Sequence, residues 1–327
     1  MISKEEEMIA CELLPFLRVR KDGTVDRLYN PVLSPPSSAE NNTGVRTKDV
    51  IISPEVSARL YLPNLSLSDT IVLNKLPILV YFHGGGFCIE SAFSTFCHHY
   101  INNIASQSNA VVVSVDYRLA PEHPLPAAYN DSWTALQWVA SHSTKHHNEK
   151  DEPWLSQHGD FERLYIGGDS AGANIAHHIA LRASTEKLHG GVNILGAFLS
   201  HPYFWGSQTL GQEAVTDRET NLLYKTWMLV YPGCHDGIDN PCINPFVKDA
   251  PSLASLGCKR LIICVASNDE LRDRGVYYYE RVKESGWKGE LSIFEVQGEG
   301  HSFHILNPET QNAKDMFKRL AAFLRGC

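Results

Sequence analysis

Short apolar runs alternate with amphipathic segments along most of this chain, beginning at Ile78. The apolar runs predict strands at Ile78–Phe82, Ala110–Asp116, Leu164–Gly167, Ile194–Ser200, Arg260–Ala266 and Leu291–Val296. Apolar residues at helical spacing predict helices at Ser94–Ser106, Ala127–Ser141, Ala173–Ser184, Arg274–Ser285 and Thr310–Arg325. This alternation is typical of an α/β fold in which helices cover both faces of a mostly parallel sheet.

The amino-terminal part of the chain has a different pattern. Residues 1–20 place their apolar side chains on a roughly helical stripe, which predicts an amphipathic segment. We expect this segment to cover another surface, because an apolar stripe needs one. Lys21–Thr24 is typical of a turn between two extended pieces at Phe16–Arg20 and Val25–Tyr29. Further strands are predicted at Val50–Ile52 and Ala58–Tyr61.

Between Tyr203 and Val247 the regular alternation stops. This stretch is rich in aromatic residues and is broken by Gly and Pro, so we expect an insertion above the edge of the sheet. Its aromatic side chains suit an apolar or aromatic substrate, although packing is the more common role of such residues.

Composition excludes several classes of protein. The 327 residues are enough for two ordinary domains or one large α/β domain. The formal charge of −8 argues against a nucleic-acid-binding surface. The longest apolar runs are far shorter than the roughly 20 residues that a membrane span needs. The acidic run Glu5–Glu7 stands where a signal peptide would be basic, so no secretory or transit peptide is predicted.

The cysteines and histidines do not form a metal-binding pattern. The 8 cysteines are scattered without a Cys-x-x-Cys pair, which predicts reduced thiols in a cytoplasmic protein. Neighbouring histidines occur at His98-His99, His146-His147 and His177-His178. Adjacent side chains point in different directions and no third ligand is spaced to join them. We therefore expect neither a metal site nor a cofactor.

The strongest chemical motif is Gly-x-Ser-x-Gly at Gly168–Gly172, between a predicted strand and a predicted helix. That context suits a nucleophile elbow, a tight turn that exposes a serine hydroxyl from a strained backbone conformation. The two glycines let the strand and the helix approach closely. The helix amino terminus offers free N–H groups beside a developing negative charge. Ser170 is therefore the candidate nucleophile.

A serine nucleophile of this kind needs an acid and a base, which follow it in that order along the chain in this type of fold. Asp269 lies just past the fifth predicted strand, at the sheet edge where functional loops gather. His301 leaves a glycine-flanked loop after the sixth. Asp273 and His304 are the alternatives. We expect Asp273 to cap a helix, and His304 lies further along the chain.

The segment His83–Phe87 contains three successive glycines directly after the first predicted strand. Without side chains, these glycines let peptide N–H groups approach a substrate oxygen. A His-Gly-Gly-Gly loop after an early strand is the oxyanion-hole partner of Gly-x-Ser-x-Gly in lipases and esterases. Together, in the correct order, the two motifs are far more specific than either one alone.

These motifs resemble those of plant carboxylesterases in the hormone-sensitive-lipase-like branch of the α/β-hydrolases. The likeness runs from Leu13 to Leu324. It includes Asp116–Glu122, and segments such as Glu284–Leu291 look closest to 2-hydroxyisoflavanone dehydratases and related esterases. The resemblance implies one α/β-hydrolase domain over residues 1–327, with a cap from about residues 1–45 and 203–247.

The same resemblance implies roles for particular residues. It implies a catalytic triad of Ser170, Asp269 and His301. It also implies an oxyanion hole formed by the N–H groups of Gly85, Gly86 and Ala171.

Three functions remain open at this point. The first is hydrolysis of small acyl or aryl esters through an acyl-enzyme intermediate, with His301 as general base. The second is a dehydratase or cyclase of specialised metabolism that uses the same base and oxyanion site without a covalent serine. The third is a hormone receptor that binds without turnover, which the filled triad positions disfavour.

Overall fold

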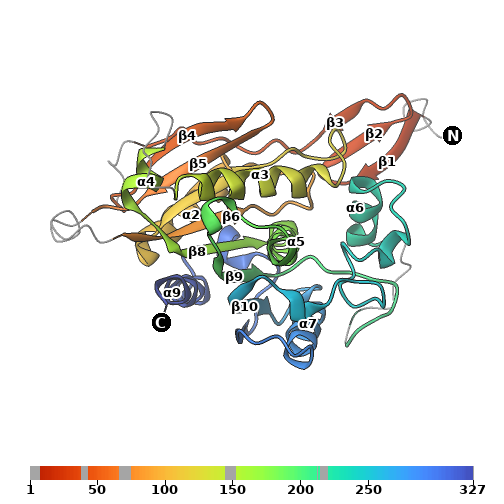
Figure 1. The fold of residues 1–327 in the computed structure, drawn as a ribbon. Helices are drawn as coiled ribbons and strands as arrows, with labels where there is room; N and C mark the ends of the chain where they lie inside the picture. The colour runs from red at the N-terminus through yellow and green to blue at the C-terminus, as the bar shows by residue number, and fades with distance from the viewer. Residues whose placement is uncertain are drawn as a thin grey trace.

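An eight-stranded sheet forms the centre of the computed structural model, which describes residues 8–37, 43–65, 75–143, 152–211, 213 and 220–326 (Figure 1). In spatial order its strands are β11 (Glu290–Val296), β10 (Cys258–Ala266), β9 (Ile194–Ser200), β8 (Gly159–Asp169), β6 (Leu76–Phe82), β7 (Val111–Asp116), β5 (Val56–Leu62) and β4 (Arg46–Ser53). Neighbours from β11 to β7 are parallel, whereas β5 and β4 add antiparallel pairs at one edge. The predicted α/β fold with a mostly parallel sheet is confirmed.

Helices cover both faces of this sheet. One face carries α3 (Ala127–Ser141), α5 (Ala171–Thr185) and α7 (Arg272–Glu284), and the other carries α2 (Thr95–Ser108), α8 (Phe303–Leu306) and α9 (Gln311–Arg325). Elsewhere in the described residues lie α4 (Pro153–His158), α6 (Leu222–Val230) and the 3₁₀ turns His189–Gly191, Gly237–Asp239 and Leu253–Ser255. Within the described residues, no helix is both long and apolar enough to cross a bilayer.

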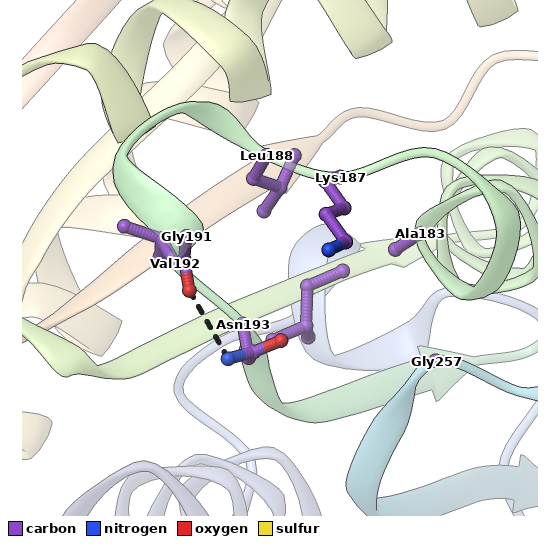
Figure 2. A pocket seen from close by; sticks show the side chains of 8 residues that line it. Ala183, Lys187, Leu188, Gly191, Val192, Asn193 and Gly257 are labelled. Carbon is purple, nitrogen blue, oxygen red and sulfur yellow. Dashed lines mark hydrogen bonds between the residues drawn. The ribbon is translucent and has the colours of Figure 1, made fainter.

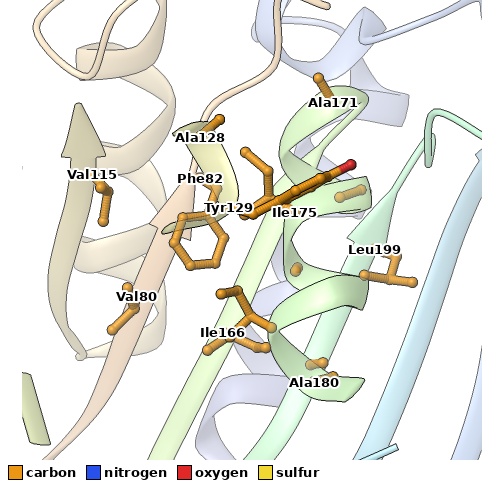
Figure 3. Packing of buried hydrophobic residues seen from close by; sticks show 14 of the residues in the cluster. Val80, Phe82, Val115, Ala128, Tyr129, Ile166, Ala171, Ile175, Ala180 and Leu199 are labelled. Carbon is orange, nitrogen blue, oxygen red and sulfur yellow. The ribbon is translucent and has the colours of Figure 1, made fainter. Parts of the chain in front are cut away.

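Strand β6 shows why the sheet needs cover on both sides. Val80 and Phe82 pack into the core under α3 and α5, while Tyr81 points into the second core under α2 and α9. Figure 3 shows Val80 and Ile166 of the sheet beside Ile175 of α5. Each such fully buried aliphatic side chain contributes about 1.5–3 kcal/mol.

The amino-terminal segment differs from the prediction. Its described part forms a three-stranded antiparallel sheet of β1 (Ile9–Leu13), β2 (Leu17–Arg20) and β3 (Val25–Arg27), so the helical stripe predicted over residues 1–20 is wrong. Pro15 sits between β1 and β2, where it would interrupt a helix. The turn at Lys21–Thr24 is confirmed, with Gly23 at φ +87°. Residues 1–7 lie outside the described part.

The predicted insertion is held to the sheet's helical layer by a buried ion pair. Arg274 of α7 lies 2.5 Å from Glu213 through Nε and Oε1, and both side chains are nearly inaccessible. The same guanidinium donates to the carbonyl oxygens of Gly206 and Gln208. Losing one partner of such a pair typically costs about 3–5 kcal/mol, because the other charge stays buried. The pair therefore anchors the segment that leads to α6.

Several histidines packed inside the molecule predict acid sensitivity. Burial lowers the pKa of His98, His177, His178, His201 and His304, to about 4 for His98 and His178. Near and below pH 6.5 the unfolded chain binds more protons at these residues than the folded chain does, so the free energy of unfolding falls as pH falls. Between pH 7 and 5, His98 and His178 should each lower the free energy of unfolding by on the order of 1–2 kcal/mol. The raised pKa of His301 acts in the opposite direction.

Urea unfolding at pH 7 and pH 5 measures this dependence. The variant His178→Gln keeps a donor for the Cys242 carbonyl, which His178 Nε2 contacts at 2.9 Å. Its free energy of unfolding should fall less between pH 7 and pH 5 than that of the wild type. Equal free energies of unfolding at the two pH values would contradict the expectation.

Candidate active site

A pocket of about 450 Å³ opens over the carboxyl ends of β6 and β8. Ser170, His301 and the glycines Gly84–Gly86 line it, together with side chains from the amino-terminal sheet and from α6. The carboxyl ends of parallel strands meet at one edge of the sheet, which is why segments distant in sequence converge there.

Ser170 occupies a strained turn between β8 and α5. Its backbone has φ +53° and ψ −116°, and its N–H donates to the carbonyl oxygen of Ser200 at 2.9 Å. A Cβ at Gly172 would lie 2.0 Å from the backbone oxygen of Phe82, and one at Gly168 would lie 2.4 Å from Gly172 itself. Only glycines permit this contact between strand and helix, so the local sequence produces the geometry expected of an elbow.

Asp269 and His301 meet beside this turn. Asp269 follows β10 and His301 follows β11, and His301 Nδ1 lies 2.8 Å from Asp269 Oδ2. Asp269 Oδ1 accepts from the N–H of Leu271 at 2.9 Å, which fixes the carboxylate. The imidazole of His301 keeps 39% of its side chain accessible and faces the pocket. Within the described residues, no hydrogen bond joins Ser170 to His301; such contacts often tighten only when substrate binds.

The charges around this pair favour a carboxylate and a basic imidazole. Desolvation acts to raise the pKa of Asp269, but hydrogen bonds from His201 and His301 outweigh it and hold that pKa well below its usual range. Desolvation acts to lower the pKa of His301, and the hydrogen bond to Asp269 with nearby carboxylate charges outweighs it, so the pKa is raised. The imidazole is therefore a stronger base than a free one.

The two alternatives from the sequence lie elsewhere. Asp273 stands in the first turn of α7 and accepts from Arg272 Nη1 at 2.6 Å. His304 is fully buried, and neither ring nitrogen has a hydrogen-bond partner in the described part of the chain. The structure thus brings His301, and not His304, against Asp269.

The glycine loop after β6 faces the Ser170 turn. Gly85 and Gly86 have φ values of +101° and +59°, and a Cβ at Gly85 would lie 2.3 Å from the carbonyl oxygen of Ile89. The N–H groups of Gly85, Gly86 and Ala171 have no acceptor among the described residues. These donors are available to a bound oxygen atom.

The segment Asp116–Glu122 supports that loop. The Tyr117 hydroxyl donates to the carbonyl oxygen of His83 at 2.7 Å, and the two rings stack with centroids 4.2 Å apart. Asp116 Oδ1 accepts from the Ser91 hydroxyl and from the N–H of Ala92. These contacts hold the segment that contains the glycines at both of its ends.

The amino-terminal sheet is tied to the same loop. Arg27 of β3 donates to the carbonyl oxygen of Cys88 at 2.5 Å and to Glu122 Oε2 at 2.5 Å. Phe16, in the turn between β1 and β2, and Tyr29, just after β3, line the pocket, as do Leu222 and Leu223 at the start of α6. Both segments expected to form a cap therefore contribute to the pocket wall.

Two buried residues of the site were not found by sequence reasoning. His201 directly follows β9, has φ +49°, and places Nδ1 2.9 Å from Asp269 Oδ2. Asp169, next to the serine, accepts from the Tyr81 hydroxyl, and burial raises the pKa of its carboxyl. Their position in the sequence could have identified them, because both residues stand at carboxyl ends of predicted parallel strands.

The atoms of His201, Asp269 and His301 also have the spacing that a metal ion would need. Their possible ligand atoms lie within 4.8 Å of one another. Both Nδ1–Oδ2 distances, 2.9 and 2.8 Å, are those of N–H···O hydrogen bonds, which satisfy the two nitrogens without an ion. The histidine pair His146-His147 lies outside the described residues.

A second pocket, of about 250 Å³, lies away from this site (Figure 2). It is lined by the end of α5 and by residues that precede β9 and β10, such as Lys187, Asn193 and Gly257. It is therefore at the amino-terminal edge of the parallel strands, opposite Ser170. None of the candidate site residues lines it.

Comparison with known proteins shows the family. A model of the alpha/beta hydrolase fold matches residues 79–305. A 2-hydroxyisoflavanone dehydratase of Glycyrrhiza echinata is 53% identical over 96% of this chain and 95% of the relative. A protein of Arabidopsis thaliana named probable carboxylesterase 13 is 42% identical over 97% of this chain and 98% of its own.

A solved esterase of Pyrobaculum calidifontis has a TM-score of 0.68 at 26% identity, covering 86% of this chain and 85% of its own. The chain therefore belongs to the α/β-hydrolases, in the branch that holds plant carboxylesterases and 2-hydroxyisoflavanone dehydratases. The resemblance and the α/β-hydrolase fold expected from the motifs are both confirmed.

Proposed function

We propose that this chain is a serine carboxylesterase that hydrolyses small acyl or aryl esters through an acyl-enzyme intermediate. One observation carries the proposal. A serine in a strained elbow, a histidine on a buried carboxylate and the unpaired N–H groups of Gly85 and Gly86 meet at one pocket, and the unpaired N–H of Ala171 directly follows the serine. That combination suits nucleophilic attack on a carbonyl carbon.

The proposed reaction follows from these positions. His301 donates from Nδ1 to Asp269, so its neutral ring presents Nε2 as the proton acceptor. Ser170 Oγ attacks the carbonyl carbon as its proton moves to His301. The resulting oxyanion accepts from the N–H groups of Gly85, Gly86 and Ala171.

Collapse of that intermediate completes the first half-reaction. The C–O bond to the alcohol breaks, and His301 returns its proton to the leaving oxygen. A water molecule then attacks the acyl-enzyme with His301 again as base, which releases the carboxylic acid and restores Ser170. These steps require no cofactor.

The pocket disfavours an anionic substrate. Its wall contains Phe16, Phe96, Leu222 and Ile305, and no Lys or Arg is among its lining residues within the described part of the chain. An anionic group would find no cationic partner there, whereas an apolar or aromatic group replaces water against hydrocarbon. We therefore propose an apolar or aromatic ester.

Dehydration is the second candidate, favoured by the 53% identity to a 2-hydroxyisoflavanone dehydratase. An elimination needs a base and an oxyanion site to hold an enolate, and His301 with the glycine loop would supply both. It does not need a covalent bond to Ser170. The two reactions therefore differ in the role of Ser170, which is a covalent nucleophile only in hydrolysis.

Covalent labelling tests the proposed nucleophile. A fluorophosphonate should react with the protein, abolish ester turnover, and leave its adduct on Ser170 in peptide mass spectrometry. The reason is that the reagent mimics the tetrahedral intermediate at an activated serine. His301→Ala should label at a strongly reduced rate. An adduct on another residue, or none in active protein, would overturn the proposal.

The amino-terminal sheet and α6 are proposed to act as the cap, and Phe16 offers a direct test. Phe16→Ala removes an aromatic side chain from the pocket wall. It should raise KM for a bulky aryl ester about 10-fold, because the substrate loses its apolar contact with the Phe16 ring. Leu14→Ala is the matched control, because Leu14 is in the same hairpin, half exposed and not in the pocket wall. Steady-state kinetics on esters of increasing acyl size measures the effect. Equal KM values for both variants would contradict it.

A further inference from the structure

Two imidazoles share one carboxylate oxygen in this site. Asp269 Oδ2 accepts from His301 Nδ1 at 2.8 Å and from His201 Nδ1 at 2.9 Å. A carboxylate can only accept, so both rings carry their proton on Nδ1. The triad that the proposed function needs uses only one of these two contacts.

The second imidazole is held more rigidly than the first. His201 is fully buried, and its backbone N–H donates to the carbonyl oxygen of Cys264 at 2.8 Å. Its ring stacks on His304 with centroids 5.3 Å apart and meets His301 edge-on at 5.5 Å. The backbone stays in the left-handed region at φ +49°, which is uncommon for a residue with a side chain. The surroundings therefore fix the direction of Nδ1.

Packing alone does not account for a histidine at this place. His201 Nε2 is buried without a hydrogen-bond partner among the described residues, so Asp269 is the only polar contact of this side chain. An unpaired buried polar atom is destabilising, and an apolar side chain of similar size would avoid that cost. What His201 supplies and an apolar residue would not is the hydrogen bond to Asp269.

We infer that His201 is a positioning residue for the proposed reaction: it holds the Asp269 carboxylate toward His301 and shares its negative charge. The inference rests on the proposed function, because it concerns the orientation of the proposed base. With Oδ1 tied to Leu271 and Oδ2 to two imidazoles, the carboxylate has no freedom to rotate away. His201 also takes part of the charge that would otherwise act on His301 alone.

The contact between His201 and Asp269 should affect the protonation of His301 in a definite direction. A neutral donor on Asp269 weakens the attraction of the carboxylate for the His301 imidazolium, so removing it should raise the pH at which His301 loses its proton. Other titratable groups around the two rings also affect the pKa of His301, and they are the same in every variant. They are Asp169 from β8, Glu270 beside Asp269, and His304 from α8.

A matched pair of variants tests the inference. His201→Asn keeps an N–H donor close to the position of Nδ1, and asparagine tolerates positive φ. His201→Leu keeps the volume and removes the donor. On an aryl ester we expect His201→Leu to lower kcat by roughly 10-fold to 100-fold, the cost of a hydrogen bond to a charged group, with KM little changed.

The acid limb of the pH profile of kcat/KM should move to higher pH in His201→Leu, and His201→Asn should stay within about threefold of the wild type in kcat. Thermal melting identifies variants that are folded. A folded His201→Leu protein with the wild-type kcat and pH profile would overturn the inference. So would a folded His201→Asn protein damaged as much as His201→Leu.

Proton NMR of wild-type protein with ¹⁵N-labelled histidine separates this inference from the proposed function. Two imidazole Nδ1–H protons bonded to the buried Asp269 carboxylate should be visible far downfield, and His201→Asn should remove one of these two. A spectrum with a single such proton would overturn the inference whatever the ester turnover. Both protons present in a protein without ester turnover would instead count against the esterase proposal and leave the shared carboxylate in place.

Discussion

Replacing Ser170 with alanine is expected to reduce ester turnover by roughly a million-fold, to the level of the uncatalysed reaction plus binding effects. The elbow places Ser170 at the pocket, and no other residue of Gly168–Gly172 carries a hydroxyl or a thiol. With the hydroxyl removed, His301 has no proton to take and no acyl-enzyme can form. Turnover of an aryl ester by the purified variant, with its melting temperature, gives the measurement.

The same variant distinguishes hydrolysis from elimination. In a dehydration Ser170 would only line the pocket or donate a hydrogen bond, so its loss should cost roughly 10-fold to 100-fold. Thr226→Val is a suitable control, because Thr226 lines the pocket with its hydroxyl bonded to the Leu222 carbonyl oxygen, and the substitution removes a hydroxyl without a change of shape. We expect negligible dehydration of a 2-hydroxyisoflavanone by the wild type. Rapid dehydration that persists in Ser170→Ala would replace the esterase proposal with a lyase.

The parts of the fold that followed from the sequence are those governed by local pattern. β6 reads as a continuous apolar run because both of its faces are covered, and the parallel order follows from alternating strands and helices. Helix ends were predictable where a cap was present, as at Ser94, whose side chain accepts from the N–H of Cys97. The turn at Ser170 was predictable because its glycines have a steric reason to be there.

The parts that did not follow depend on tertiary contacts. The segment Ile9–Leu13 has apolar residues at spacings that suit either a helix or a strand, and pairing with β2 decides between them. Pro15 was the local signal against a helix. His201 is separated from Asp269 by 68 residues and carries no motif, so only the adjacency of β9 and β10 brings the two together.

The glycine loop should be the next most sensitive element after the proposed triad. Gly85→Ala is expected to lower kcat on an aryl ester by about 100-fold to 1,000-fold, the usual cost of one oxyanion-hole donor. At φ +101°, with a Cβ 2.3 Å from the Ile89 carbonyl oxygen, an alanine cannot fit unless the backbone moves. That movement takes the proposed N–H donor of Gly85 away from the developing oxyanion. KM should change much less, because the donor acts mainly in the transition state.

Gly286→Ala is the matched control for this prediction. Gly286 has a similar φ of +86°, and a Cβ there would have nothing within 4 Å, so this variant carries the backbone strain without the collision. It should lose some stability and keep its kcat. Melting temperatures of both variants separate a folding defect from a catalytic one. If Gly85→Ala is folded and turns over the ester at the wild-type kcat, the loop does not hold the oxyanion, and those N–H groups serve another purpose in this pocket.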